Sequence, residues 1–150
     1  MLSNVCMQTN DAHPRYFICS LATRAARRMV AYYNRTLAPL GLTAQQVMAL
    51  GVLWQEDGIS LGEFARRAGM GKAAAVAMIR RLERMDLVTR TPDPADGRFN
   101  VLNLTPKARD MAPEILSLGA TLERTVEQAV GKQDMEAMIR GLKAIQELDI

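Results

Sequence analysis

The spacing of apolar residues along the chain predicts a series of helices. Within residues 14–39 apolar side chains recur at every third or fourth position, which is the period of one helix face, and Gly41 ends this predicted helix. The same period returns after Thr43, and again after Pro106 and after Gly131. The pattern therefore predicts helices at both ends of the chain and in its middle.

Helix-starting residues divide the middle of the chain into short helices. Thr43–Gln46 reads T-x-x-Q and Ser60–Glu63 reads S-x-x-E, and both are capping boxes at a helix start. Gly69 ends the helix that follows the second box, and Gly71 is an acceptable N-cap for a helix over 72–85. Two short helices joined by a glycine-containing turn are the helix-turn-helix pattern.

The residues that follow have the character of strands. Leu87–Thr91 and Phe99–Leu104 are predicted strands, and the segment between them, Pro92–Arg98, contains two prolines and an Asp-Gly pair that favour a reversal. A β-hairpin with an exposed tip is therefore predicted. Thr105 and Pro106 then restart helix as N-cap and first helical residue.

These elements predict one mainly α domain with a small β-hairpin. The central part covers about residues 42–104, and helices flank it over about 14–39 and 106–148. The flanking helices carry long apolar faces that the small centre cannot cover, and exposed apolar stripes of this size usually meet a partner. We therefore expect a homodimer whose interface is built from both ends of the chain.

Composition narrows the class of protein. Hydrophobic residues make up 49% of the 150 residues and charged residues 23%, an ordinary balance for a soluble domain. The first twelve residues lack the features of a secretory signal, and apolar stretches such as Val47–Trp54 are too short to span a bilayer. Cys6 and Cys19 are too few for a disulfide scaffold, which favours a cytoplasmic protein with no membrane partner.

The residue types that metal binding and catalysis need are scarce. His13 is the single histidine, and together with two scattered cysteines it does not make a metal site. The sequence contains no recognisable Ser/His/Asp or Cys/His set. We expect neither a cofactor nor an enzyme.

Charge is unevenly placed along the chain. Residues 59–104 carry eight basic and five acidic side chains, whereas residues 105–150 carry six basic and eight acidic ones. A basic middle and an acidic end indicate that an anionic partner docks on the central part. A solvated helix face is the alternative interpretation.

The segment GMGKAAAVAMIRRLER, residues 69–84, is not a phosphate-binding loop. Gly71 and Lys72 supply the G-K of such a loop, but Arg66 stands at the first glycine position and Ala73 at the Ser/Thr position. No strand is predicted before the segment.

The same segment forms a two-faced helix. At 100° per residue one face collects the predicted core positions, which are Ala75, Met78, Ile79 and Leu82. The opposite face carries Ala73, Ala77, Arg80 and Arg84. Small residues allow close approach to base edges and arginines reach phosphates, which suits a helix in the major groove of DNA. An ordinary surface helix remains the alternative.

The chain resembles the MarR family of bacterial transcription regulators. The resemblance rests on LTAQQVMALGVLW, on SLGEFARRAGMGKAAAVAMIRRLERMDLVTR and on DPADGRFNVLNLT, and it spans about residues 42–106. It implies a winged helix-turn-helix domain flanked by dimerisation helices, which binds a pseudo-palindromic operator as a dimer and acts as a repressor. Helix 72–85 would be the recognition helix and the hairpin would be the wing.

The resemblance also assigns residues to double-stranded DNA. Arg98 matches the arginine that the family places in the minor groove, and Asp96 matches the acid that braces it. The full predicted DNA-binding set is Ser60, Gly71, Lys72, Ala73, Ala74, Ala77, Arg80, Arg84 and Arg98. Glycine and alanines stand where relatives commonly have Ser or Thr. Our hypothesis is that affinity is mainly electrostatic and that sequence is read through thymine methyl groups and Arg98.

Control by a small molecule is a further implication of the resemblance. Many relatives release DNA when a small aromatic or phenolic acid binds between the dimerisation helices and the winged part. Tyr16, Tyr33 and Trp54 are the candidate ligand-binding residues, with Arg15 as a carboxylate partner. Core packing is the alternative for these aromatic residues.

Two other functions remain open. Some relatives sense peroxide through a cysteine in the first helix, where Cys19 stands with Tyr33 fourteen residues further on. However, Thr23 and Ala44 occupy positions where activating tyrosines are expected. The second alternative is a winged-helix interaction module without specific DNA binding, because the recognition face is rich in alanine.

Overall fold

The computed structural model describes the backbone of residues 14–148 and the side chains of residues 18–148. The elements follow the order α1 (Pro14–Leu37), the 3-10 turn η1 (Ala38–Leu40), α2 (Ala44–Gln55), β1 (Ile59–Ser60), α3 (Leu61–Arg67), α4 (Lys72–Arg84), β2 (Val88–Pro92), β3 (Asn100–Leu104), α5 (Pro106–Val130) and α6 (Lys132–Gln146). The predicted mainly α fold with a hairpin is confirmed, and each predicted helix is present.

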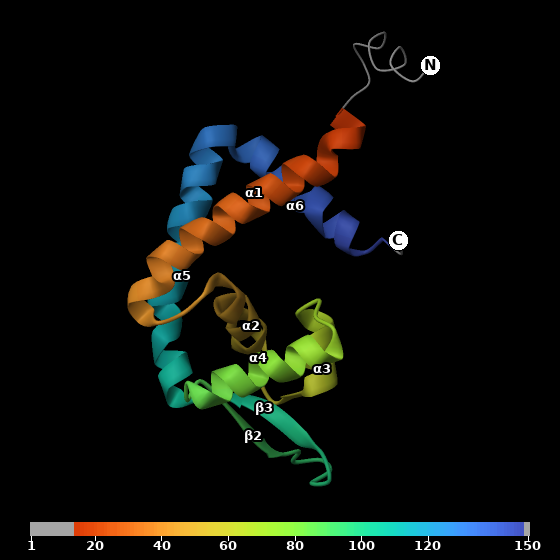
Figure 1. Cartoon of the computed structure of the whole chain (residues 1–150), viewed down its shortest axis with the longest axis vertical. Helices are drawn as coiled ribbons and strands as arrows, with labels where there is room; N and C mark the ends of the chain where they lie inside the picture. The colour runs from red at the N-terminus through yellow and green to blue at the C-terminus, as the bar shows by residue number, and fades with distance from the viewer. Residues whose placement is uncertain (1–13, 149–150) are drawn as a thin grey trace.

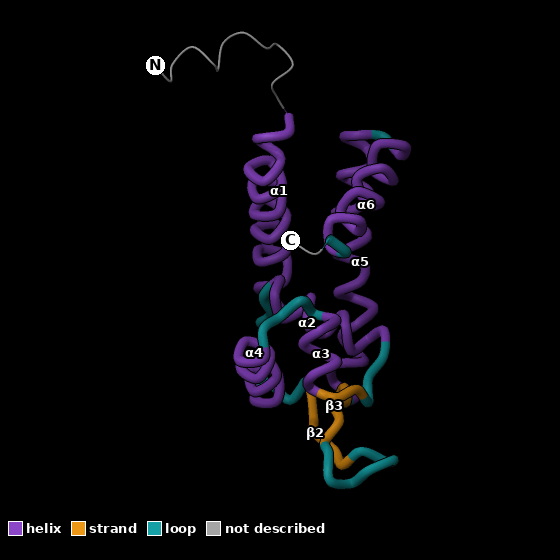
Figure 2. Tube along the Cα trace, turned by 90° about the vertical axis from the view of Figure 1, so that its right-hand side faces the viewer, coloured by secondary structure: helices purple, strands orange, loops and turns teal. Residues whose placement is uncertain are grey.

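The molecule has two ends of different character (Figure 1). At one end α1, α5 and α6 form an elongated arrangement of helices, and the start of α1 and the end of α6 lie there. At the other end α2, α3 and α4 pack with the small sheet, and the β2–β3 hairpin projects away from α1 and α6 (Figure 2). Within the described residues 14–148 no single helix has the length and hydropathy of a bilayer span; α1 and α2 have them only jointly, across an 82° bend.

Side-chain caps explain where two of the central helices begin. Thr43 Oγ1 accepts the Gln46 N–H at 3.3 Å, and Gln46 Oε1 accepts the Thr43 N–H at 2.8 Å, so the predicted capping box of α2 is complete. At α3, Ser60 Oγ accepts the Glu63 N–H at 3.1 Å. The second half of that predicted box is replaced, because the Glu63 carboxylate binds two guanidinium groups instead, and such charge-assisted bonds are the stronger ones.

The turn between α3 and α4 is closed by a Schellman motif. Gly69 adopts φ +61°, its N–H donates to Arg66 O at 3.2 Å, and the Met70 N–H donates to Ala65 O at 2.9 Å. This positive φ is the conformation in which a side chain costs energy, so glycine ends α3 here as predicted. The chain then enters α4 from Gly71, its N-cap.

The sheet has one more strand than the sequence pattern predicted. Its order is β1-β3-β2 with antiparallel pairing, and Ile59 and Ser60 pair with Leu102 and Val101. The predicted β2–β3 hairpin is confirmed. A strand of two residues is too short to show an alternating pattern, which is why it was missed.

The core lies between α2, α3, α4, the sheet and the start of α5. Its largest fully buried side chains include Leu50, Leu53, Phe64, Leu87 and Leu102. On α4 the four predicted core positions are all buried, which confirms the predicted face. Burial of a large aliphatic or aromatic side chain contributes about 1.5–3 kcal/mol, so this cluster fixes α4 against the rest of the domain.

The first turn of α5 joins the two ends of the molecule. Trp54 Nε1 donates to Ala108 O at 3.1 Å, and Asp57 accepts hydrogen bonds from Leu104 N–H and the Arg109 guanidinium. Thr105 caps α5 and donates through Oγ1 to Asp86 O at 2.8 Å, just beyond α4. Since α5 continues into the elongated end, these bonds set how that end meets α2, α4 and the sheet.

Asp86 provides a test of the backbone at the end of α4. It is a non-glycine residue at φ +58° and occupies the same place in a Schellman motif after α4 that Gly69 occupies after α3. Asp86→Gly relieves the left-handed strain of the folded state, but it also makes the unfolded chain more flexible. We expect the first effect to be the larger, with a net stabilisation of about 0.5–1 kcal/mol. Gly69→Ala is the matched variant and should lose about 1 kcal/mol. Urea unfolding measures both, and a destabilised Asp86→Gly protein would contradict the expectation.

Candidate nucleic-acid interface

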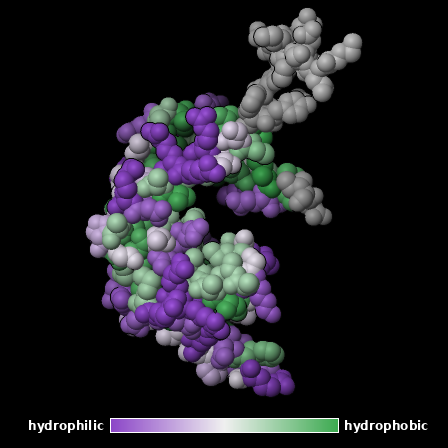
Figure 3. All heavy atoms as spheres, viewed as in Figure 1, coloured by the Kyte–Doolittle hydropathy of each residue, from purple (hydrophilic) through white to green (hydrophobic). Residues whose placement is uncertain are grey.

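Helix α4 presents a small and basic face to solvent. Its predicted outer residues Ala73, Ala74, Ala77, Arg80 and Arg84 are all exposed. Gly71 at the N-cap has no side-chain acceptor, so it leaves the first N–H groups of the helix uncapped by a side chain. Figure 3 shows apolar surface where α4 begins and hydrophilic surface towards its end. The alanines and arginines thus occupy separate halves of one face.

Two open concavities border this face. The first, about 500 Å³, lies between α2 and the first half of α4, and Met48, Met70 and Met78 contribute to its lining. The second, about 520 Å³, lies over the second half of α4 and is lined by Ala77, Arg80, Arg81, Glu83 and Arg84. Arg81 borders both. The second concavity is therefore rich in guanidinium groups and contains a single carboxylate.

The hairpin tip, which follows β2, holds Arg98 beside Asp96. Arg98 Nη2 and Nε donate to the Asp96 carboxylate at 2.7 and 3.0 Å, and the Arg98 backbone N–H donates to it at 3.1 Å. These bonds, the side-chain bond foremost, lower the pKa of Asp96 below its usual value of 3.8. The Arg98 side chain is still 84% exposed. The carboxylate therefore orients the guanidinium without covering it.

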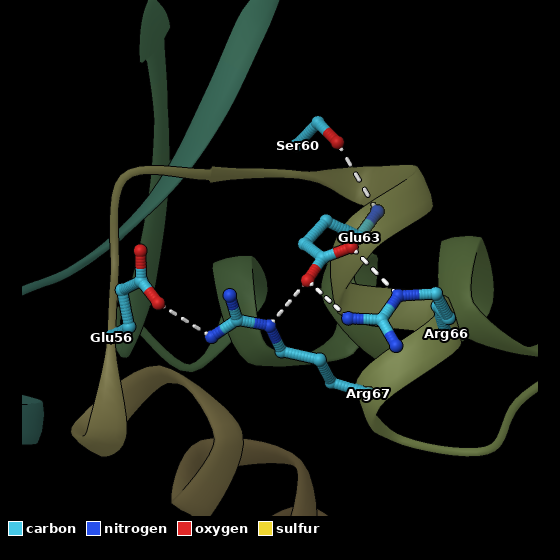
Figure 4. A network of polar contacts seen from close by, with 5 residues as sticks. All are labelled: Glu56, Ser60, Glu63, Arg66 and Arg67. Atoms are coloured by element: carbon cyan, nitrogen blue, oxygen red, sulfur yellow. Dashed lines mark hydrogen bonds and ion pairs between the residues drawn. The ribbon is translucent and has the colours of Figure 1, made fainter.

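A network of four charged residues runs along the exposed side of α3 (Figure 4). Arg66 binds both carboxylate oxygens of Glu63 at 2.7 and 2.9 Å, and Arg67 bridges Glu63 to Glu56 at the end of α2. Hydrogen bonds from Arg66 and Arg67 lower the pKa of Glu63 to about 2. Ser60, at the N-cap, remains exposed beside this network. The network links α2 to α3 across the solvent surface.

Comparison with known proteins identifies the family. The MarR family model matches residues 42–99. A solved structure of the transcriptional repressor CouR bound to a 23-mer DNA duplex superposes with a TM-score of 0.77 at 30% identity, covering 85% of this chain and 90% of that one. The chain belongs to the MarR family. It is thus a DNA-binding transcriptional regulator of the winged helix-turn-helix class and not an enzyme.

Two further MarR-like relatives are similar over most of the chain. A structure of BpsR from Bordetella bronchiseptica, solved to explain regulation of its DNA binding by 6-hydroxynicotinic acid, is 25% identical with a TM-score of 0.78, and covers 88% of this chain and 94% of that one. The organic hydroperoxide resistance transcriptional regulator of Bacillus subtilis is 27% identical over 108 residues, which are 67% of this chain and 74% of the relative.

Two candidate ligand-binding aromatics of this MarR-family chain, Trp54 on α2 and Tyr33 on α1, contact different parts of α5. Trp54 is half-buried and its N–H is bonded to Ala108, whereas the half-buried Tyr33 hydroxyl lies 3.3 Å from where a Cβ would stand on Gly119. Eleven residues of helix separate these two contacts, a rise of about 16 Å. Burial raises the pKa of Tyr33 above 10.0, with smaller contributions from Glu123 and Tyr32. The side chains of Arg15 and Tyr16 lie outside the described residues.

The candidate redox residue of this MarR-family chain, Cys19, is exposed on α1. Exposure is one requirement of a reactive thiol, and a lowered thiol pKa is the other. Peroxide sensing therefore stays a prediction.

Sequence reasoning passed over a pair of residues that join α4 to the wing of this MarR-family protein. Arg90 on β2 binds the Glu83 carboxylate with its Nε at 2.9 Å and its Nη2 at 3.5 Å. A signal for Arg90 was present, because it stands two residues after the buried Val88 and so lies on the same side of the strand. Glu83 lies too far from it in sequence for local spacing to reveal the pair.

The α3 network gives a test by titration. Because the folded-state pKa of Glu63 is about 2 instead of the usual 4.5, its pairing stabilises the folded state above about pH 4.5 and this contribution is lost as pH falls towards 2. Carbon-13 NMR of the Glu63 carboxyl group should show little protonation at pH 4. In an Arg66→Gln, Arg67→Gln protein the same carboxyl group should titrate near 4.5. An unshifted midpoint in the wild type would refute the network in solution.

Proposed function

We propose that the protein is a homodimeric repressor that binds a pseudo-palindromic operator. Each protomer places α4 in a major groove and Arg98 in the adjacent minor groove. The observation that carries the proposal is the one-sided burial of α4, which leaves a continuous alanine and arginine face exposed on the same end of the molecule as the wing. The DNA-binding part comprises about residues 42–104, and the dimerisation part comprises about residues 14–39 and 106–148.

The basic side chains of α4 support phosphate contacts. Within residues 18–148, Lys72, Arg80 and Arg84 take part in no ion pair, so their charge is available to an anionic partner. The open N–H groups after Gly71 add a second site for a phosphate oxygen, because helix N-termini attract anions. Ala73, Ala74 and Ala77 allow the backbone to approach the bases and contact thymine methyl groups.

Exposed apolar residues at the elongated end support the dimer. On α1 these are Ile18, Leu21 and Met29, and on α6 and just beyond it they are Met138, Ile139, Leu142, Ile145 and Leu148. Side chains of this size, between 39% and 58% exposed along two helices, form a stripe that is unfavourable in water. A second copy of the chain would bury them.

A small aromatic or phenolic acid is the proposed effector, acting in the cytoplasm. The regulation of the similar BpsR by 6-hydroxynicotinic acid supports this class of ligand. Tyr33 and Trp54 both contact α5, the helix that joins the DNA-binding part to the dimerisation part. An effector that displaced either contact would change how these two parts meet. Arg15 and Tyr16 remain the proposed partners from the start of α1.

DNA binding is tested by selecting bound duplexes from a random pool and then measuring affinity over a salt series. Phosphate contacts release counterions, so we expect the affinity to fall steeply with salt, by a slope of about −0.9 for each phosphate neutralised. Two half-sites about one helical turn apart should emerge from the selection. A salt slope near zero would leave a winged-helix interaction module without DNA binding as the better description.

Arg98 is tested on the selected operator. Arg98→Ala should weaken binding roughly tenfold or more, since a specific groove contact is worth about 1–3 kcal/mol. Arg124→Ala removes one positive charge from the exposed surface of α5 and is the control. Equal losses in the two variants would mean that Arg98 contributes only net charge.

The dimer is tested at the apolar stripe. Leu142→Glu places a charge in the proposed interface, where an unpaired charge is costly to bury, and should convert the dimer to monomers in sedimentation experiments. Gln133→Glu, an exposed position at the start of α6, is the control and should remain dimeric. A Leu142→Glu protein that still sediments as a dimer would move the interface elsewhere.

A further inference from the structure

The second half of α4 forms a basic concavity with one acidic residue at its edge. We define the arginine cleft as Ala77, Arg80, Arg81 and Arg84, which line the 520 Å³ concavity described above. Glu83 also lines it and is the only acidic residue of α4. Its carboxylate stands at the edge of a surface that would otherwise attract anions strongly.

Arg90 occupies the position from which it can neutralise this carboxylate. On β2 the side chains alternate, so Arg90 lies on the same side as Val88, which is buried in the core. From there its Nε and Nη2 reach the two oxygens of Glu83 at 2.9 and 3.5 Å. Both side chains are about one-third exposed, at 33% for Arg90 and 31% for Glu83.

On helical geometry, Arg81 and Glu83 flank the outer face of α4 on opposite sides, 160° apart. Arg81 is exposed and belongs to no ion pair within residues 18–148. It therefore brings a third free guanidinium to the cleft, beside Arg80 and Arg84. Glu83 is held on the side of the wing, where it does not pair with any of these three.

We propose that Arg90 is a positioning residue that neutralises Glu83 and keeps it on the wing side, so that the arginine cleft binds a backbone phosphate of DNA. This inference rests on the proposed function, and it adds Arg81 to the DNA-contacting residues. Three guanidinium groups over a small floor at Ala77 match the several acceptor oxygens of a phosphate.

The proposal predicts that Arg90 acts through Glu83. Without Arg90 the Glu83 carboxylate is unpaired at the edge of the cleft, where it repels the phosphate or pairs with a neighbouring arginine. Because the unpaired Glu83 carboxylate would stand close to the bound phosphate, we expect the Arg90 variant to bind DNA roughly tenfold more weakly at low salt. Removing the Glu83 carboxylate as well should restore the affinity, because the cleft then holds no negative charge that Arg90 has to neutralise.

The experiment is a double-mutant cycle on the selected operator, with Arg90→Gln, Glu83→Gln and the double variant. We expect Arg90→Gln to weaken binding roughly tenfold, and Glu83→Gln and the double variant to bind at least as tightly as the wild type. Lys132→Gln removes the same charge at the start of α6, at the far end of the molecule, and is the control. Arg81→Gln should reduce the salt slope by about 1, as expected for one lost phosphate contact.

Two results would overturn the proposal while the wild type still binds DNA. If Arg90→Gln is equally weak with and without Glu83, Arg90 itself contacts the DNA. If Glu83→Gln weakens binding as much as Arg90→Gln does, the pair only holds the wing in place, and thermal unfolding of the variants should then show the same loss. A wild type without salt-dependent binding to any duplex would instead overturn the proposed function and this inference together.

Discussion

The arrangement of the winged helix-turn-helix end depends on the burial of one face of α4. Ile79 and Leu82 are completely buried between α2, α3 and the sheet, and Ala75 allows the helices to approach closely. Burial of each large side chain contributes about 1.5–3 kcal/mol. Rotation of α4 about its axis would expose these side chains and lose more free energy than a contact on the surface could supply. The direction in which Arg80 and Arg84 point is therefore a consequence of core packing, and the exposed face needs no stabilising contacts of its own.

The start of α5 carries this fixed orientation to the rest of the molecule. Thr105 and Lys107 donate to backbone carbonyl groups at the end of α4, and Ala108 accepts from Trp54 on α2. Further along the helix, Pro113 has no N–H to donate to the carbonyl of Arg109, which weakens the helix at that point. The first turn of α5 is thus tied to the winged part by hydrogen bonds, and Ile115, just beyond Pro113, is still buried in the same core before the helix continues into the elongated end. The proposed effector, bound near Trp54 or Tyr33, would act on this junction.

The ion pairs of the surface contribute more to orientation than to stability. Exposed ion pairs in general contribute little to stability because water screens them, and the pairs of Glu63, Asp96 and Glu83 are all at least partly exposed. Each of them nevertheless fixes where a guanidinium group stands. Asp96 orients Arg98 at the tip of the wing, and Arg90 and Glu83 fix each other beside α4, so that these acidic residues of the basic surface are each paired with an arginine.

The sequence by itself determined the helices and the buried face of α4, because caps and apolar periodicity act between residues at most four positions apart. Thr43, Gly69 and Thr105 mark helix ends by their own chemistry, and the spacing of Ala75, Met78, Ile79 and Leu82 needs no knowledge of the fold. Only the tertiary structure decided the pairing of β1 with β3, the bond from Trp54 to Ala108 and the pair of Glu83 with Arg90. These contacts join segments that lie apart in sequence and meet only in the folded protein, and no local pattern encodes them. Glu63 is an intermediate case. Its possible partners are all local, but whether it completes the capping box or pairs with Arg66 and Arg67 depends on which of the competing hydrogen bonds is stronger.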